Sequence, residues 1–143
     1  MRLSIGADHA AFNLKSELIP YLEQKGHTVK DFGTYSAEST DYPDYAHPVS
    51  NSVETGDADF GILICGSGEG MCMTANKHAG IRAGLVWNTE TAGLIREHNN
   101  ANVICFGARF VDAETAKAIL DTFLATPYAG GRHERRVEKM TSF

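Results

Sequence analysis

A cysteine, a serine and three alternating glycines stand together in the loop 65–70 (CGSGEG), at the end of the apolar stretch 60–65. Glycines let the chain turn tightly, so that successive N–H groups aim at one point. Because a helix is expected to begin just after the loop, that point carries a positive partial charge, which favours an oxyanion or a thiolate. The loop therefore predicts either a site where negative charge develops or a plain tight turn between a strand and a helix.

The loop matches neither of the common nucleotide-binding motifs. A P-loop ends in Gly-Lys followed by Ser or Thr, and this loop has no lysine. The dinucleotide fingerprint needs a third glycine where Met71 stands, and it follows the first strand of a fold, whereas this loop follows the third expected strand.

Two side chains in the sequence allow both a structural and a catalytic interpretation. Cys65 is either a small core residue or, beside converging amides, a thiolate that acts as a base or nucleophile, with Ser67 supplying a hydroxyl for proton relay. His98 either caps a helix C-terminus or acts as a general acid. Cys72 and Cys105 lack such surroundings, and we expect both in the core.

Basic side chains offer a site for phosphate. Arg132 and Arg136 are four residues apart, so they share one face of a helix, and two guanidinium groups match phosphate geometry well. Glu134 and Glu138 lie between and beside them, so a solvated charged face is the alternative. Arg109, after another expected strand, is a separate candidate.

The pattern of apolar residues and turn signals predicts alternating strands and helices. We expect strands at 2–7, 28–32, 60–65, 83–87 and 103–106, and helices at about 14–25, 46–55, 71–77, 89–98, 113–125 and 132–140. Pro20 is expected to kink or shorten the first helix. The prediction is a single α/β domain spanning 1–143, an open parallel five-stranded sheet with helices on both faces, that is, a Rossmann-like three-layer sandwich.

This fold predicts where the candidate residues meet. Ligands of open α/β sheets bind beyond the carboxyl ends of the strands. Asp8 and His9, the loop 65–70 and Arg109 each follow a strand and are expected there. His98 and Asn99 instead close the helix that leads into the last strand.

Composition narrows the possible function. The 143 residues carry 18 acidic and 13 basic side chains, a net charge of −5 that argues against general nucleic-acid binding. No apolar run reaches the length of a membrane span, and the N-terminus lacks the features of a signal peptide. Three cysteines, an odd number, favour reduced thiols, so we expect a soluble cytoplasmic protein. No histidine pair has the spacing of a helical zinc motif.

The candidate residues together resemble the type B ribose-5-phosphate isomerase family, which includes the galactose-6-phosphate isomerase subunits. The resemblance runs in order along essentially the whole chain and favours the catalytic interpretations above. The matching stretches are Gly6–His9, Thr40–Pro43, Gly61–Gly70, Ala75–Lys77, Gly80–Ala83, His98–Val103, Phe106–Arg109 and Gly130–Val137.

The resemblance implies an aldose–ketose isomerase that interconverts ribose 5-phosphate and ribulose 5-phosphate through a cis-enediolate, without metal or cofactor. Cys65 matches the base that moves a proton from C2 to C1, with Ser67 beside it. His98 matches the acid that opens the furanose ring, and Asp8 matches an aspartate near the sugar hydroxyls. Some relatives use a glutamate one position after the last loop glycine, but Met71 stands there, so the base is assigned to Cys65.

The resemblance also implies a set of substrate contacts, largely at the phosphate end. Glu69 belongs to the set as part of the loop, and its side chain is expected in solvent. The expected contacts are Asp8, His9, Gly66, Ser67, Gly68, Glu69, Gly70, Asn99, Arg109, Arg132 and Arg136.

The resemblance further implies a homodimer, which in some relatives assembles into a tetramer, with active sites shared between subunits. The helix 132–140, after a hinge at Gly130 and Gly131, is expected to be an arm to the partner. Two alternatives stay open: an isomerase of a six-carbon sugar phosphate, such as allose 6-phosphate or galactose 6-phosphate, and a non-catalytic sugar-phosphate-binding module.

Overall fold

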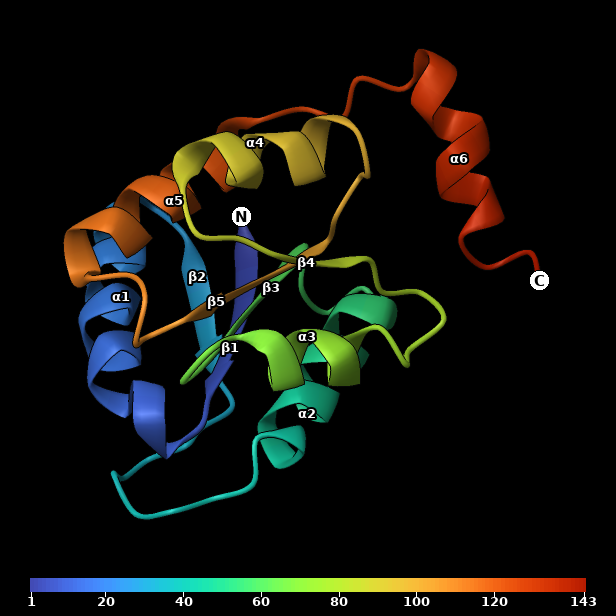
Figure 1. Cartoon of the computed structure of the whole chain (residues 1–143). Coiled ribbons are helices and arrows are strands. Elements are labelled where there is room, and N and C mark those ends of the chain that lie inside the picture. The colour runs from blue at the N-terminus through green and yellow to red at the C-terminus, as the bar shows by residue number, and fades with distance from the viewer.

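Five parallel strands form one open sheet in the order β2-β1-β3-β5-β4 (Figure 1). The computed structural model describes residues 1–143. The predicted single-domain α/β fold is confirmed. The strands are β1 (Arg2–Ala7), β2 (Thr28–Asp31), β3 (Phe60–Cys65), β4 (Ala83–Leu85) and β5 (Val103–Gly107).

Helices cover both faces of the sheet, and one helix stands apart from these layers (Figure 1). On one face α1, α4 and α5 enclose the larger apolar core, and on the other α2 and α3 enclose the smaller one. α6 buries none of its side chains. The helices are α1 (Phe12–Gln24), α2 (Pro43–Glu54), α3 (Glu69–Ala75), α4 (Thr89–Glu97), α5 (Ala113–Ala125) and α6 (Glu134–Lys139), with 3₁₀ turns at His9–Ala11 and Gly131–His133.

β3 shows why its sequence is continuously apolar. Successive side chains of a strand point to opposite faces. Accordingly Ile62 and Ile64 pack in the larger core, while Leu63 and Cys65 pack in the smaller one. A strand covered on both sides has no polar face to alternate with, so the sequence pattern predicted its position correctly.

Several element boundaries differ from the sequence predictions. α2 begins at Pro43, three residues early, because proline is preorganised for the first turn of a helix. α1 continues through Pro20 and ends at Gln24, just before Gly26 with its φ of +92°. α3 starts at Glu69, inside the glycine loop rather than after it. The last helix is shorter than 132–140, because Gly131–His133 form a 3₁₀ turn.

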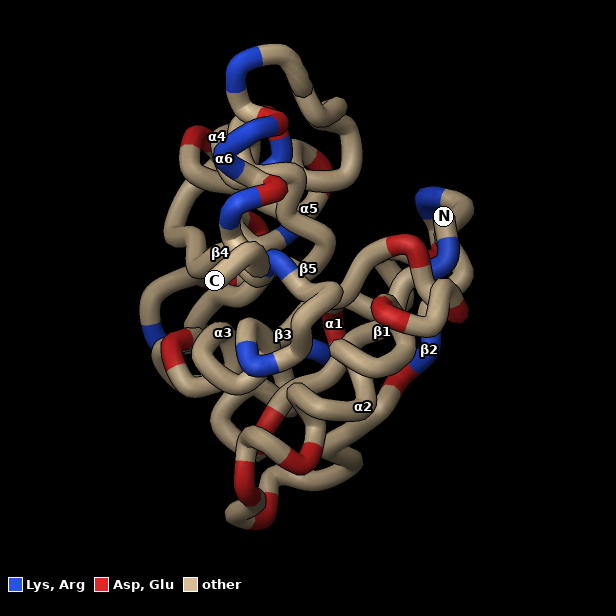
Figure 2. Tube along the Cα trace, turned by 90° about the vertical axis from the view of Figure 1, so that its right-hand side faces the viewer, with Lys and Arg blue, Asp and Glu red and all other residues tan.

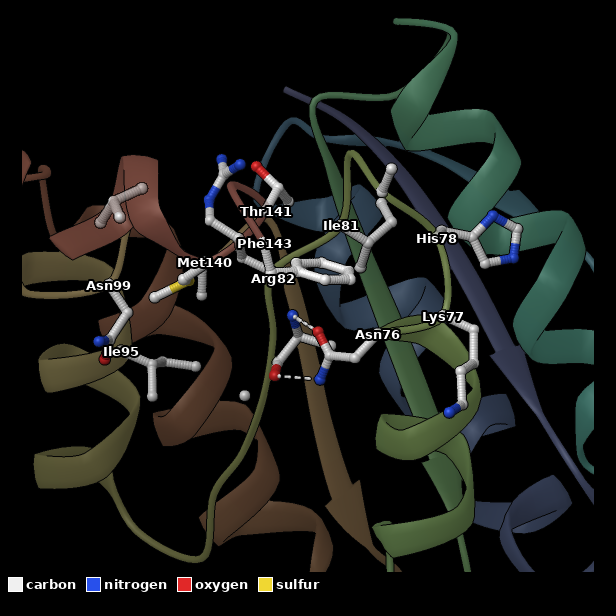
Figure 3. A pocket seen from close by; sticks show the side chains of 15 residues that line it. Asn76, Lys77, His78, Ile81, Arg82, Ile95, Asn99, Met140, Thr141 and Phe143 are labelled. Carbon is white, nitrogen blue, oxygen red and sulfur yellow. Dashed lines mark hydrogen bonds between the residues drawn. The ribbon is translucent and has the colours of Figure 1, made fainter. Parts of the chain in front are cut away.

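An asparagine side chain covers the edge of the sheet at β4. The Asn76 amide accepts a hydrogen bond from the Ala83 N–H and donates one to the Ala83 carbonyl, both at 2.9 Å (Figure 3). This pair of hydrogen bonds imitates a neighbouring strand. It leaves less of the backbone of β4 free to pair with another chain.

Basic side chains outnumber acidic ones in the C-terminal arm, residues 130–143. Figure 2 shows basic and acidic residues alternating along α6. The basic residues are Arg132, Arg135, Arg136 and Lys139.

None of the helices has the length and apolar character needed to span a membrane.

Candidate active site

The structure brings three predicted segments together at the carboxyl edge of the sheet. The Asp8 N–H donates to the Ile64 carbonyl at 3.2 Å, at the end of β3. The Ala108 N–H donates to the Cys65 carbonyl at 2.9 Å, and the Arg109 N–H donates to the Gly66 carbonyl at 3.1 Å. Asp8, the loop 65–70 and Arg109 are therefore neighbours, as the parallel sheet predicted.

Cys65 sits at the end of β3 with its sulfur enclosed by the loop that follows. The residue is only 5% exposed, and the Gly68 N–H points at its Sγ at 3.1 Å. The Ser67 Oγ accepts from the Glu69 N–H at 3.4 Å, and the Glu69 side chain is exposed, as expected.

The loop can take this shape only with glycine at position 68. Its φ is +86°, in the left-handed region. A Cβ there would lie 2.7 Å from the Leu85 side chain and 2.8 Å from the Phe106 carbonyl carbon. The amide that reaches Cys65 is thus held against the central strand β5.

The other two cysteines are held differently. Cys105 is completely buried, and burial raises its pKa well above the ordinary value, so it is a core thiol as predicted. Cys72 is only partly buried, which corrects the expectation that it lies in the core. Its Sγ donates to the Ala83 carbonyl at 3.4 Å.

Asp8 and His9 open the turn that leads into α1. Asp8 is 7% exposed, and its carboxylate caps this turn by accepting from the Ala10 N–H at 3.0 Å. His9 Nδ1 accepts from the Thr40 N–H at 3.1 Å. A neutral His9 therefore carries its proton on Nε2, where it can donate to a ligand.

Sequence reasoning assigned no role to two residues of the connection before α2. Thr40 orients His9, and the Tyr42 ring packs so closely on Gly70 that a Cβ there would lie 2.5 Å from the ring. The only sequence signal was the stretch Thr40–Pro43 in the family resemblance. No local pattern predicts that a long connection folds back over the glycine loop.

His98 and Asn99 lie at the opposite edge of the sheet from Cys65. His98 follows α4, which leads to the amino end of β5. At that end of β5, Val103 pairs with Gly61 of β3. Gly61 precedes Cys65 by four residues, a separation of roughly 13 Å along the strand. Within one chain, therefore, the structure does not bring His98 and Asn99 to the cysteine.

The arm is anchored to His98. The rings of His98 and His133 stack with centroids 4.4 Å apart and planes 14° from parallel. Arg132 and Arg136 belong to this arm and are exposed, and one Arg136 amino group lies 3.5 Å from the Arg132 carbonyl. The predicted site residues thus form two groups, one at each edge of the sheet. Sequence reasoning gave His133 no role.

A cavity of about 590 Å³ lies between the arm and the body of the protein (Figure 3). It belongs to the second group, because Asn99 lines it and Cys65 does not. Ile81, Ile95 and Phe143 are among the hydrophobic residues that line it. No three His, Cys, Asp or Glu side chains anywhere in the structure are arranged to hold a metal ion.

Comparison with known proteins assigns the family. A family model described as Ribose/Galactose Isomerase matches residues 3–140. The chain belongs to this family. It is 48% identical over 141 residues to ribose-5-phosphate isomerase B of Escherichia coli, covering 99% of this chain and 95% of that protein.

Two further members show how uniform the fold is and how the named substrates vary. A crystal structure of a ribose 5-phosphate isomerase from Thermotoga maritima matches with a TM-score of 0.97 and 51% identity, covering 99% of this chain and 98% of that one. D-erythrulose-4-phosphate isomerase of Pectobacterium atrosepticum is 42% identical over 98% of this chain and 93% of that protein.

Replacing Gly68 should expose Cys65. We expect Gly68→Ala to lower the free energy of unfolding by more than about 1 kcal/mol, the scale of left-handed strain alone, because the new methyl also meets β5. The displaced amide should let a thiol reagent modify Cys65 faster, as measured by peptide mass spectrometry. Gly56→Ala is the control: its φ is +81°, with open space around it. Equal Cys65 reactivity in both variants would contradict this account.

The histidine stack should be visible in a pH titration. The pKa of His133 is lowered by desolvation and then by the charges of His98, Arg132 and Arg136, with Glu97 opposing them. Because the pKa of His133 is lowered in the folded protein, protonation of His133 costs folding stability, and this stability is lost as the pH falls toward that lowered pKa. We expect His98→Asn to raise the His133 midpoint in an NMR titration. His27, whose pKa is lowered by its own burial and the amino terminus, should stay unchanged.

Proposed function

We propose that this protein interconverts ribose 5-phosphate and ribulose 5-phosphate. The observation that carries the proposal is the Cys65 sulfur under the Gly68 amide, in a loop that contacts Asp8 and Arg109, in a chain of the ribose/galactose isomerase family. Full-length similarity to proteins named ribose-5-phosphate isomerase B supports the five-carbon substrate. The test is a panel of kcat/KM values on four-, five- and six-carbon sugar phosphates, with ribose 5-phosphate expected to be best.

The proposed reaction is a proton transfer between neighbouring carbons. His98 protonates the ring oxygen, and the hydroxyl on C1 gives up its proton with the assistance of Asp8, so that the bond from C1 to the ring oxygen breaks and the aldehyde forms. The Cys65 thiolate then removes the proton from C2, and the electron pair forms a C1–C2 double bond as the carbonyl oxygen becomes negative. The amides of Gly66 to Gly70 stabilise this enediolate, since fixed dipoles stabilise developing charge without rearranging. Cys65 returns the proton to C1, and Ser67 relays the hydroxyl proton from O2 to O1, leaving the ketone at C2.

Binding of the phosphate would hold the reacting carbons in place. His9, Arg109, Arg132 and Arg136 are proposed to contact the phosphate end, and Asn99 the sugar. Binding energy from a group that does not react can position the one that does. The protein is proposed to act in the cytoplasm.

The division of the site residues supports a homodimer. One chain supplies Cys65 at the carboxyl edge, and the His98 group of a second chain would complete the site. Exposed apolar side chains lie near the carboxyl ends of β4 and β5 and on the neighbouring helix α3, where an arm could dock: Met73, Trp87 and Phe110 are each at least half exposed. We propose that the arm of each chain reaches this region of its partner.

The relative named D-erythrulose-4-phosphate isomerase favours a four-carbon sugar phosphate as the second candidate. Six-carbon sugar phosphates and binding without turnover are decided by the same panel. Folded protein that converts none of the substrates would indicate a binding module.

Replacing the proposed base should remove turnover and spare binding. We expect Cys65→Ala to lower kcat by about 1,000-fold or more, with affinity for ribitol 5-phosphate, which cannot isomerise, changed by less than about tenfold, because a proton-transfer group acts mainly in the transition state. Cys72→Ala, which removes a thiol outside the site, is the control. Near-normal kcat in Cys65→Ala would exclude the sulfur from the reaction.

A shared site predicts recovery of activity on mixing two inactive variants. Cys65→Ala and His98→Asn, each inactive on the cyclic sugar, should give roughly a quarter of wild-type activity when unfolded together and refolded in equal amounts. Half of the random pairs are mixed, and each mixed pair has one intact site of two. No recovery from well-folded mixed dimers would show that each site is made by one chain.

A further inference from the structure

Lys15 is a buried lysine close to the candidate site. It lies on α1 with only 2% of its surface exposed, and its Nζ is 2.7 Å from both carboxylate oxygens of Asp31 at the end of β2. The ammonium group also lies over the rings of Tyr35, at 5.3 Å, and Phe12, at 5.9 Å. Asp31 keeps 30% of its side-chain surface exposed, whereas the ammonium group of Lys15 has lost its water. That loss costs much of what the attraction to Asp31 returns, so stability alone is a poor reason for this arrangement.

Asp31 fixes the start of the connection 32–42, between β2 and α2. Its Oδ1 accepts from the Gly33 N–H at 2.9 Å, and its carbonyl accepts from the Tyr35 hydroxyl at 3.0 Å. Three further hydrogen bonds tie the connection to β1. The Phe32 N–H donates to the Ile5 carbonyl at 2.9 Å, the Ala7 N–H donates to the Gly33 carbonyl at 2.7 Å, and the Thr34 N–H donates to the Ala7 carbonyl at 2.6 Å. The start of the connection is thus bound beside the residue that precedes Asp8.

The end of the same connection touches the site directly. The Thr40 N–H donates to His9 Nδ1, and the ring of Tyr42, the last residue of the connection, covers Gly70. Lys15 lies six residues after His9, on the helix that the His9 turn begins. The ion pair therefore joins the two chain segments whose relative position decides the Thr40–His9 hydrogen bond.

We propose that Lys15 and Asp31 are positioning residues that fix the imidazole of His9. By holding the connection 32–42 against β1 and α1, the pair keeps the Thr40 amide on Nδ1, so that Nε2 presents its N–H to the phosphate of the substrate. The identity of the ligand, a substrate phosphate, rests on the proposed function. The position of the His9 ring does not depend on whether the protein converts a sugar phosphate.

The test makes the same substitution at two lysines, one within α1 and one directly after its last residue. Lys15→Met removes the buried ammonium group. Lys25→Met, at the C-terminal end of α1, removes an exposed one that pairs with Asp121 at 3.1 Å. The first readout is the ¹⁵N spectrum of the His9 ring at a pH where it is neutral. Wild type and Lys25→Met should show Nε2–H alone, whereas Lys15→Met should show shifts averaged between the two tautomers.

The second readout is the kinetics on ribose 5-phosphate. Lys15→Met should raise KM by about 10- to 100-fold with kcat within about threefold, because a contact made equally in ground and transition states affects binding alone. Lys25→Met should change neither. Circular dichroism and thermal unfolding establish that each variant is folded, and a purely structural pair would shift the melting temperature without moving the His9 spectrum.

Each result decides between the claims. Folded Lys15→Met with an unchanged His9 spectrum and an unchanged KM would overturn the positioning role even if the wild type is an active isomerase. A changed His9 spectrum in a protein that converts no sugar phosphate would keep the positioning role and overturn the proposed function. Should Lys15→Met not fold, Asp31→Asn, which keeps an oxygen for the Gly33 N–H but loses the charge, must show the same changes in weaker form.

Discussion

The hydrogen bond from the Gly68 amide to the Cys65 sulfur joins the fold to the proposed chemistry. A cysteine at the end of a buried strand would ordinarily be an inert core side chain. Here the loop turns back sharply enough to place a donor 3.1 Å from that sulfur. The turn requires the left-handed φ of Gly68 and its close packing on Phe106. Strands β3 and β5 therefore determine the surroundings of the thiol, and within one chain Asp8 and Arg109 are the predicted site residues that lie beside its loop.

The sequence predicted the fold and one half of the site for the same reason. In a parallel sheet all strands end on the same side, so Asp8, Cys65 and Arg109 were expected there once their strands were recognised. The strand order β1-β3-β5, which the sequence did not predict, makes them neighbours. The sequence did not predict what depends on long connections, such as Tyr42 lying over Gly70. Lys15 was missed although it shares a stripe with Leu18 and Leu22, because charged residues are rarely buried unless paired, and its partner Asp31 lies beyond the next turn.

The position of His98 follows from the direction of the chain. A helix that leads into a parallel strand ends at the amino edge of the sheet, and α4 does so. The family resemblance groups His98 with Cys65, while the geometry of one chain separates them. The proposed homodimer would reconcile the two, because the second group of residues would then come from another copy. The basic arm and its stack on His98 then act as one unit, since they are held together within one chain.

α6 has only six residues and buries none of them in its own chain. A helix this short gains too little from its own hydrogen bonds to persist in water without a surface to pack on. In an isolated chain the end of the arm should fray, and ordering it would be part of the cost of association. Pairing and arm folding would then be a single coupled equilibrium. In the proposed homodimer, dilution would therefore separate the chains and take each shared site apart, even while each sheet stays intact.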